Sequence, residues 1–148
     1  MIRTKRRLAI CTALILAILA FIWGNSLIPA ELSHAMSEWV KGLIKPFLSE
    51  GAPVIQEDNA LVRKIAHFLE FAALGFCIAW RRGMLRKSPI PGFFAGTAAA
   101  VLDETIQLFV PNRGPGVLDV VLDSSGVLAG MLLLHLGHTL RKKRNLQS

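Results

Sequence analysis

Residues 103–126 read DETIQLFVPNRGPGVLDVVLDSSG. Four carboxylates, two amides and a guanidinium lie in this stretch, between two runs that otherwise have the composition of membrane spans. A charged side chain at the centre of a membrane helix costs about 2.5–3.5 kcal/mol on insertion scales. Because several such groups occur together here, we expect them to serve a purpose that offsets this cost.

The overall composition is that of a membrane protein rather than of an ordinary soluble domain. Of 148 residues, 53% are hydrophobic, and the mean hydropathy is +0.48. This length accommodates about four helices of about 20 residues each, joined by short loops. We therefore predict an all-α integral membrane protein, with residues 1–148 forming one domain built as a bundle of four transmembrane helices.

Positive charge is concentrated in three short clusters. Each cluster holds four basic residues, lies beside an apolar run and contains no acidic residue; the clusters are residues 3–7, 81–87 and 141–144. This is the positive-inside pattern. It predicts a multi-pass protein of the cell membrane with both termini in the cytoplasm. These topogenic charges account for the pI of about 10.1. Anionic lipid headgroups on the cytoplasmic face are the expected partners of the clusters, and no nucleic acid partner is expected.

The apolar runs place the spans at about residues 8–28, 61–80, 90–110 and 117–136. The first run is longer than the core of a usual signal peptide and has no clear cleavage site after it, so we interpret it as an uncleaved anchor. Residues 31–48 show apolar positions at helical spacing opposite a polar face, which predicts an extracytoplasmic amphipathic helix between spans 1 and 2. Whether this helix is a plain linker or a lid over a site is left open.

Helical spacing decides which residues of each span share a face. In the fourth span one stripe is acidic in its outer half and small in its inner half: Asp119, Asp123, Gly126 and Gly130. The third span has an equivalent stripe, with Glu104 beside it: Gly92, Gly96, Ala100, Asp103 and Gln107. In the second span Arg63, His67, Glu70 and Leu74 share a face, with Lys64 to one side. Because Leu74 is large, and Ala73 and Gly75 only flank this stripe, close helix packing is less expected there.

If the three stripes face one another, their polar residues gather in a pocket that opens to the outer leaflet. The predicted ligand-binding residues are Arg63, Lys64, His67, Glu70, Asp103, Glu104, Gln107, Arg113, Asp119 and Asp123. Among them, five carboxylates face three fixed cations. The surplus acids must therefore be protonated, metal-bound, solvated, or paired with a cationic ligand or with the histidine.

Several chemistries fit this set of residues. General acid–base catalysis would use His67, Glu70, Asp103, Glu104 or Asp123 as candidates. A divalent metal could be held by His67, Glu70 and the aspartates, although no spacing is diagnostic and no other cofactor is indicated. A structural salt-bridge network would use the same residues to fix helix register. The sequence alone does not decide whether the protein is an enzyme, nor its oligomeric state.

Three segments resemble the VanZ-like family of small bacterial membrane proteins. They are the serine-containing segment from Asn25 to Ser37, the segment from Arg63 to Gly75, and the segment from Asp103 to Arg113 followed by Asp119, Asp123 and Gly126. The third segment is the most specific. The family often has tyrosine where this chain has Phe71, so any role of that hydroxyl is absent here.

The resemblance implies a helical membrane protein associated, in the family's namesake, with low-level resistance to the lipoglycopeptide teicoplanin. Such drugs act outside the membrane on cell-wall precursors, which agrees with a site that opens outward. The leading hypothesis is a protein that binds or handles a lipid-linked envelope component or a lipoglycopeptide. The alternatives are an intramembrane acid–base or metal-dependent enzyme acting on an envelope lipid, and a structural or assembly subunit.

Overall fold

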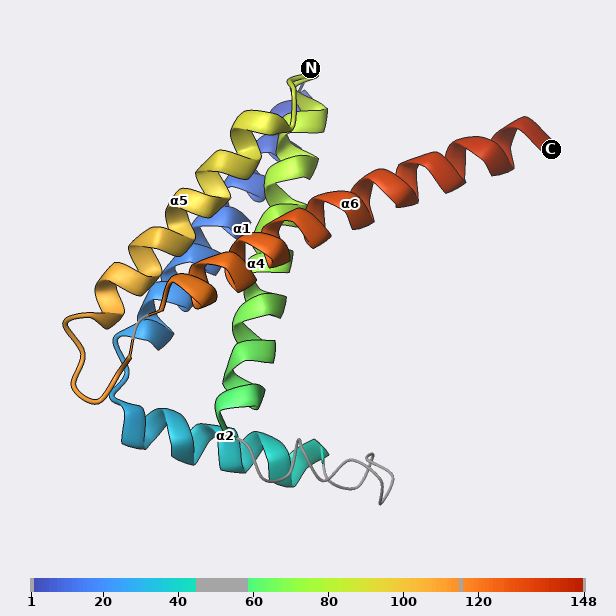
Figure 1. Ribbon diagram of the computed structural model, residues 1–148. Helices are drawn as coiled ribbons and strands as arrows, with labels where there is room; N and C mark the ends of the chain where they lie inside the picture. The colour runs from blue at the N-terminus through green and yellow to red at the C-terminus, as the bar shows by residue number, and fades with distance from the viewer. Residues whose placement is uncertain (1, 45–58, 115, 148) are drawn as a thin grey trace.

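The computed structural model describes residues 2–44, 59–114 and 116–147. Within these ranges the chain forms helices and no strand: α1 Ile2–Ser26, α2 Ala30–Ile44, α4 Asn59–Met84, α5 Ile90–Gln107 and α6 Val117–Gln147 (Figure 1). The predicted all-α class is confirmed. The helix predicted over residues 31–48 is present as far as Ile44, and residues 45–48 lie outside the described ranges.

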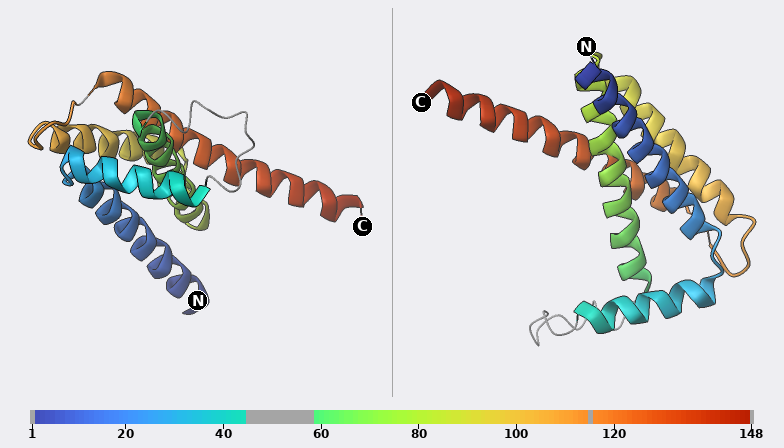
Figure 2. Two further views of the ribbon diagram at one scale, coloured as in Figure 1. Left: turned by 90° about the horizontal axis from the view of Figure 1, so that it is seen from below. Right: turned by 180° about the vertical axis from the view of Figure 1, so that it is seen from behind.

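Helices α1, α4 and α5 lie side by side, and α2 crosses one end of this group (Figures 1 and 2). The N-terminus, the end of α4 and the start of α5 all lie at the opposite end. Two of the basic clusters, residues 3–7 and 81–87, are therefore at the end of the molecule that is remote from α2. The turn between α5 and α6 lies at the α2 end.

The core joins α1, α4, α5 and α6 through buried apolar side chains. Its members are Ile22, Phe71, Leu74, Ala99, Ala100, Val127 and Met131. The small stripe predicted on α5 packs as expected, because a Cβ at Gly96 would lie 2.6 Å from Val127 Cγ1 and one at Gly92 would lie 2.7 Å from the side chains of Ile78 and Arg82. Small residues on α5 thus admit side chains from the neighbouring helices.

Helices α4 and α6 make the most extensive contact in the fold, and their backbones touch. A Cβ at Gly130 would lie 1.8 Å from the Ala72 carbonyl oxygen, and one at Gly75 would lie 2.1 Å from the Val127 carbonyl oxygen. The small stripe predicted on α6 is therefore a close-packing surface. The expectation that α4 would pack less closely was wrong, because Gly75, beside the polar stripe, and Ala72, further round the helix, receive α6.

The C-terminal part of α6 diverges from the other helices and projects from the molecule (Figure 1), and most side chains after Met131 are exposed. The arrangement differs in this respect from an upright bundle that is packed along its whole length. Two helical segments, Thr4–Ser26 and Val117–Asn145, are long and apolar enough to cross a membrane by length and composition. Helices α4 and α5 carry most of the polar site residues, which makes them less apolar.

Helix α2 turns a face with Ser37 and Lys41 toward the other helices and leaves its large apolar side chains exposed, beside exposed acidic residues. Ser37 and Lys41 are buried, whereas Leu32, Met36 and Trp39 are exposed. This orientation is typical of a helix whose apolar face lies in a membrane interface.

Candidate functional site

The site lies where the α2-side halves of α4, α5 and α6 meet the end of α1. The polar residues of each predicted stripe point into this region. Gly126 and Gly130, about one and two turns after Asp123 on α6, hold α6 against α4. Asp103 and Asp123 are 0% and 1% exposed, so both carboxyl groups lie inside the protein.

Asp103 of α5 is the best-bonded acid of the site. Its Oδ1 accepts a hydrogen bond from the Ser26 hydroxyl at 2.6 Å, and its Oδ2 accepts one from the Gln107 side-chain amide at 3.0 Å. His67 Nδ1 of α4 lies 3.8 Å from the same Oδ2. Three helices are therefore joined at one carboxyl group.

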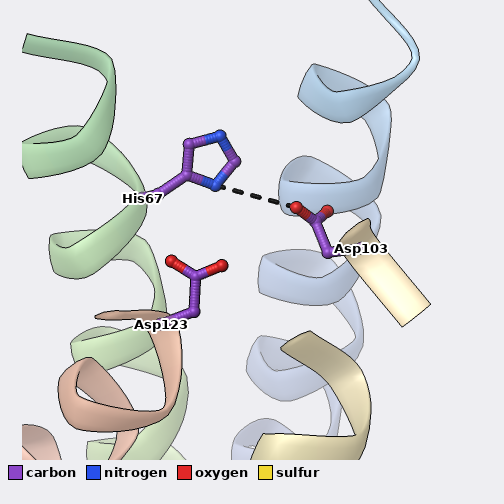
Figure 3. A group of neighbouring side chains, drawn as sticks. All are labelled: His67, Asp103 and Asp123. Atoms are coloured by element: carbon purple, nitrogen blue, oxygen red, sulfur yellow. Dashed lines mark ion pairs between the residues drawn. The ribbon is translucent and has the colours of Figure 1, made fainter. Parts of the chain in front are cut away.

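Asp123 of α6 is equally buried but bonded differently. Neither of its carboxyl oxygens has a hydrogen-bond partner among the described residues, and the same holds for His67 Nδ1. Figure 3 shows the His67, Asp103 and Asp123 side chains converging on one point between the helices. One ligand-type atom of each residue lies within 4.8 Å of the others.

Glu104 of α5 forms a hydrogen bond with the backbone just before α6. Its Oε1 accepts a hydrogen bond from the Gln107 amide at 3.3 Å, and its Oε2 accepts one from the backbone N–H of Gly116 at 3.0 Å. Because Gly116 immediately precedes α6, this contact positions the turn that delivers Asp119 and Asp123.

The cations lie around the rim of the site. Lys64 Nζ forms an ion pair with Asp119 Oδ1 at 2.9 Å. Arg113 donates from Nη2 to the carbonyl oxygens of Asn25 and Ile28, both at 3.1 Å, and so caps the end of α1. Burial, followed by the neighbouring charge of Arg63, lowers the pKa of the Arg113 guanidinium from its ordinary value.

Two cavities meet at His67. One of about 30 Å³ is lined by polar groups of α4, α5, α6 and the turn between α5 and α6, including Arg63, Glu104, Gln107, Arg113 and Asp123. This volume is enough for a water molecule or an ion. The second, of about 210 Å³, lies between α1, α2 and α4 and is shared by Arg63, His67, Glu70 and Arg113.

The structure brings the predicted residues together in these two cavities. Eight of the ten line the smaller one: Arg63, Lys64, His67, Glu104, Gln107, Arg113, Asp119 and Asp123. Asp103 adjoins it through Gln107 and His67. Glu70 lines the larger cavity instead, where its Oε1 accepts a hydrogen bond from the Asn25 amide at 3.2 Å.

Sequence reasoning missed the contribution of α1 to the site. Ser26 is fully buried against Asp103, and Asn25 bonds Glu70. The available signal was the polar pair Asn25–Ser26 at the outer end of the first apolar run. Its position matched that of the acids on the other spans.

The arrangement supports two kinds of chemistry. An imidazole facing two buried carboxyl groups can exchange a proton with one of them, or share a cation with both. The rim cations, in contrast, suit phosphate or carboxylate groups of a ligand.

The family model of VanZ/LLP1 matches residues 11–138, which include all five described helices in whole or in part. Neither a curated protein nor a solved structure gives a significant match. The chain therefore belongs to the VanZ/LLP1 family.

Proposed function

We propose that this VanZ/LLP1 protein binds or handles a lipid-linked cell-envelope component or a lipoglycopeptide at a polar site that opens to the outer leaflet. The observation that carries the proposal is the cluster of acids on α5 and α6, of which Asp103, Glu104 and Asp123 are buried, with three cations at its rim. In this proposal α1, α4, α5 and α6 cross the cell membrane, both termini are cytoplasmic, and residues 1–148 act as one domain.

Helix length and exposure support the four spans. At 1.5 Å per residue, α4 and α5 are about 39 and 27 Å long, against a hydrocarbon core of about 30 Å. Their polar side chains face the site, whereas Ile65 and Leu69 of α4 and Phe94 and Leu102 of α5 are exposed. Apolar residues on the outside and acids inside are what a polytopic protein needs.

The rim supports an anionic ligand group. Arg63 lines both cavities, and Lys64 is half exposed beside its partner Asp119. A phosphate or carboxylate approaching from the α2 end would meet these two cations first. Arg113 lies next to them, but the α1 carbonyls already take up part of its donor capacity.

Two alternatives each have an observation in their favour. Asp123, without a hydrogen-bond partner among the described residues and close to His67, suits an enzyme that acts on an envelope lipid by acid–base or metal-assisted chemistry. Asp103, with both oxygens bonded, suits a structural network that fixes helix register.

The deciding experiment pairs Glu104→Gln with Asp123→Asn, with Ser125→Ala as control because Ser125 is exposed and its hydroxyl bonds its own helix. Folded protein in the membrane is quantified first, followed by glycopeptide susceptibility and outer-leaflet precursor lipids. We expect normal protein levels and a lost phenotype in both site variants. A phenotype that only tracks protein level would support the structural alternative, and chemical conversion of a labelled lipid by the wild type would support the enzyme.

A further inference from the structure

Asp123 presents a problem that hydrogen bonding within the described residues does not solve. Its side chain is 1% exposed and both carboxyl oxygens are without a hydrogen-bond partner there. Burying a carboxylate without a partner is strongly unfavourable, and proteins normally pair such a group, protonate it or give it a metal ion. One ligand-type atom of each of His67, Asp103 and Asp123 lies within 4.8 Å of the others, and the three side chains converge on one point (Figure 3).

We infer that His67, Asp103 and Asp123 bind one divalent cation. The inference rests on the proposed function in that it names a ligand of the same site. Charge supports it, because two carboxylates and a neutral imidazole carry two negative charges, which a divalent ion cancels. A neutral assembly is what a buried site requires.

The donor types narrow the choice of metal. One imidazole nitrogen with carboxylate oxygens suits Mn²⁺ or Zn²⁺ better than an ion that prefers oxygen ligands alone. Bond lengths of about 2.0–2.2 Å put ligand atoms about 3–3.5 Å apart, and the three donors already lie within 4.8 Å of one another. Rotation of the Asp123 side chain, which has no hydrogen bond to lose among the described residues, would bring the donors closer.

The surroundings support each ligand as metal sites usually require. Ser26 and Gln107 donate hydrogen bonds to Asp103, one to each oxygen, and so hold that carboxylate in place. The backbone contact of Gly126 with Phe68, next to His67, holds the α6 ligand against the α4 ligand.

Three protein ligands leave at least one coordination position for another group. The cavity of about 30 Å³ adjoins both His67 and Asp123 and is shared with Arg63 and Lys64. A phosphate or carboxylate oxygen that is bound by these cations would therefore lie next to the metal. The cation would extend the anion site of the rim into the interior.

The test uses the full-length protein in detergent, freed of metal with EDTA. Binding of Mn²⁺ is followed by the EPR signal of the free ion, and binding of Zn²⁺ by competition with a chromogenic chelator. We expect one ion per chain for the wild type, and at least a 100-fold loss of affinity in Asp123→Asn. Ser125→Ala is the control, because Ser125 lies on the same helix, is exposed and bonds its own helix; its affinity should stay within a factor of two.

Each variant is first checked for helicity and monodisperse elution. If Asp123→Asn fails to fold, His67→Phe takes its place, with a loss of at least ten-fold expected. Gln107→Leu, which removes a donor to Asp103, should lose about 10- to 100-fold. Absence of stoichiometric Mn²⁺ or Zn²⁺ binding by the wild type, or full affinity in the folded ligand variants, would overturn the inference.

The experiments can contradict cation binding and the proposed function independently of each other. Stoichiometric binding together with unchanged glycopeptide susceptibility in Asp123→Asn cells would keep the metal site and remove the proposed function. A lost phenotype in Asp123→Asn cells, without any cation binding by the wild type, would keep the proposed function and remove the metal site.

Discussion

At the scale of single residues, Ser26 and Asp103 join α1 to α5 inside the protein. Their hydrogen bond is 2.6 Å long, and both side chains are fully buried. Hydrogen bonds between membrane helices contribute from about 0.6 to about 2 kcal/mol, and bonds to charged groups lie at the upper end.

We expect Ser26→Ala to lower the free energy of unfolding by about 1–2 kcal/mol, because one oxygen of Asp103 loses its donor. Thermal unfolding in detergent measures the loss, and Ser125→Ala is the control with an exposed hydroxyl that bonds its own helix. In the background of Asp103→Asn the effect of Ser26→Ala should shrink. Equal effects in both backgrounds would show that the two residues are not coupled.

Arg113 stabilises the end of α1 with several donors at once. Its Nε and Nη2 both reach the Ile28 carbonyl, and Nη2 also reaches that of Asn25. We expect Arg113→Lys to cost about 1–3 kcal/mol of stability, since an ammonium group keeps the charge but not the planar arrangement of donors. Thermal unfolding is again the measurement. Arg141→Lys, at an exposed position, should change nothing, and an equally small effect at Arg113 would contradict its capping role.

The acids of the site could be predicted from the sequence because a carboxylate inside an apolar run is unusual in itself. Ser26 gave a weaker signal, its place beside Asn25 at the outer end of the first apolar run, since a hydroxyl costs little in a membrane helix and serine is common at helix ends. Its role depends on the approach of α1 to α5, which no spacing within one helix encodes.

At the scale of helices, the periodicity of α5 and α6 correctly predicted which faces carry small residues and which carry acids. The same reasoning misjudged α4, because a stripe drawn through Arg63, His67 and Leu74 treats the polar residues as the centre of the contact. The contact with α6 is instead centred on Ala72 and Gly75, to one side of that stripe. A large residue on the polar stripe therefore does not prevent close packing beside it.

The closest backbone approach between α4 and α6 gives the sharpest test of this packing. We expect Gly130→Ala to lower stability by about 1–3 kcal/mol, because its Cβ would lie 1.8 Å from the Ala72 carbonyl oxygen. The matched control is Gly137→Ala on the same helix, where nothing lies within 4 Å. This control should be neutral or more stable by up to about 1 kcal/mol, because alanine is the better helix former.

The Gly130 variant should also disturb the site. A shift of α6 away from α4 separates Asp123 from His67, so the phenotype should weaken more than the protein level does. Thermal unfolding and the susceptibility assay measure the two effects. A Gly130→Ala protein as stable as the wild type would contradict the close packing of α4 and α6.

At the scale of the whole molecule, the sequence could predict the order of the helices but not the angle of α6. Periodicity fixes which face of a helix is buried, whereas the crossing angle depends on how two surfaces fit. The glycine contacts with α4 determine where α6 crosses, and the part of α6 beyond Met131 then diverges from the other helices. The C-terminal basic cluster lies in this projecting part.

The topology of α6 can be tested with introduced cysteines, because the two native thiols, Cys11 and Cys77, are buried. A membrane-impermeant maleimide should label Gly114→Cys in intact cells, since Gly114 is exposed in the turn between α5 and α6. Lys87→Cys and Asn145→Cys, in or next to basic clusters, should be labelled only after permeabilisation.

The labelling of the three positions tests the orientation of α4 and the crossing of α6 independently. Labelling of Lys87→Cys in intact cells would show that the end of α4 is outside and would contradict the proposed orientation. If Asn145→Cys is labelled in intact cells while Lys87→Cys is protected, α6 does not cross the membrane, and its projecting half lies along the outer surface. With both protected and Gly114→Cys labelled, α6 must cross the bilayer, and its exposed apolar residues then face lipid. In that case the acids of α6 enter the membrane from the same side as those of α5, as an outward-opening site requires.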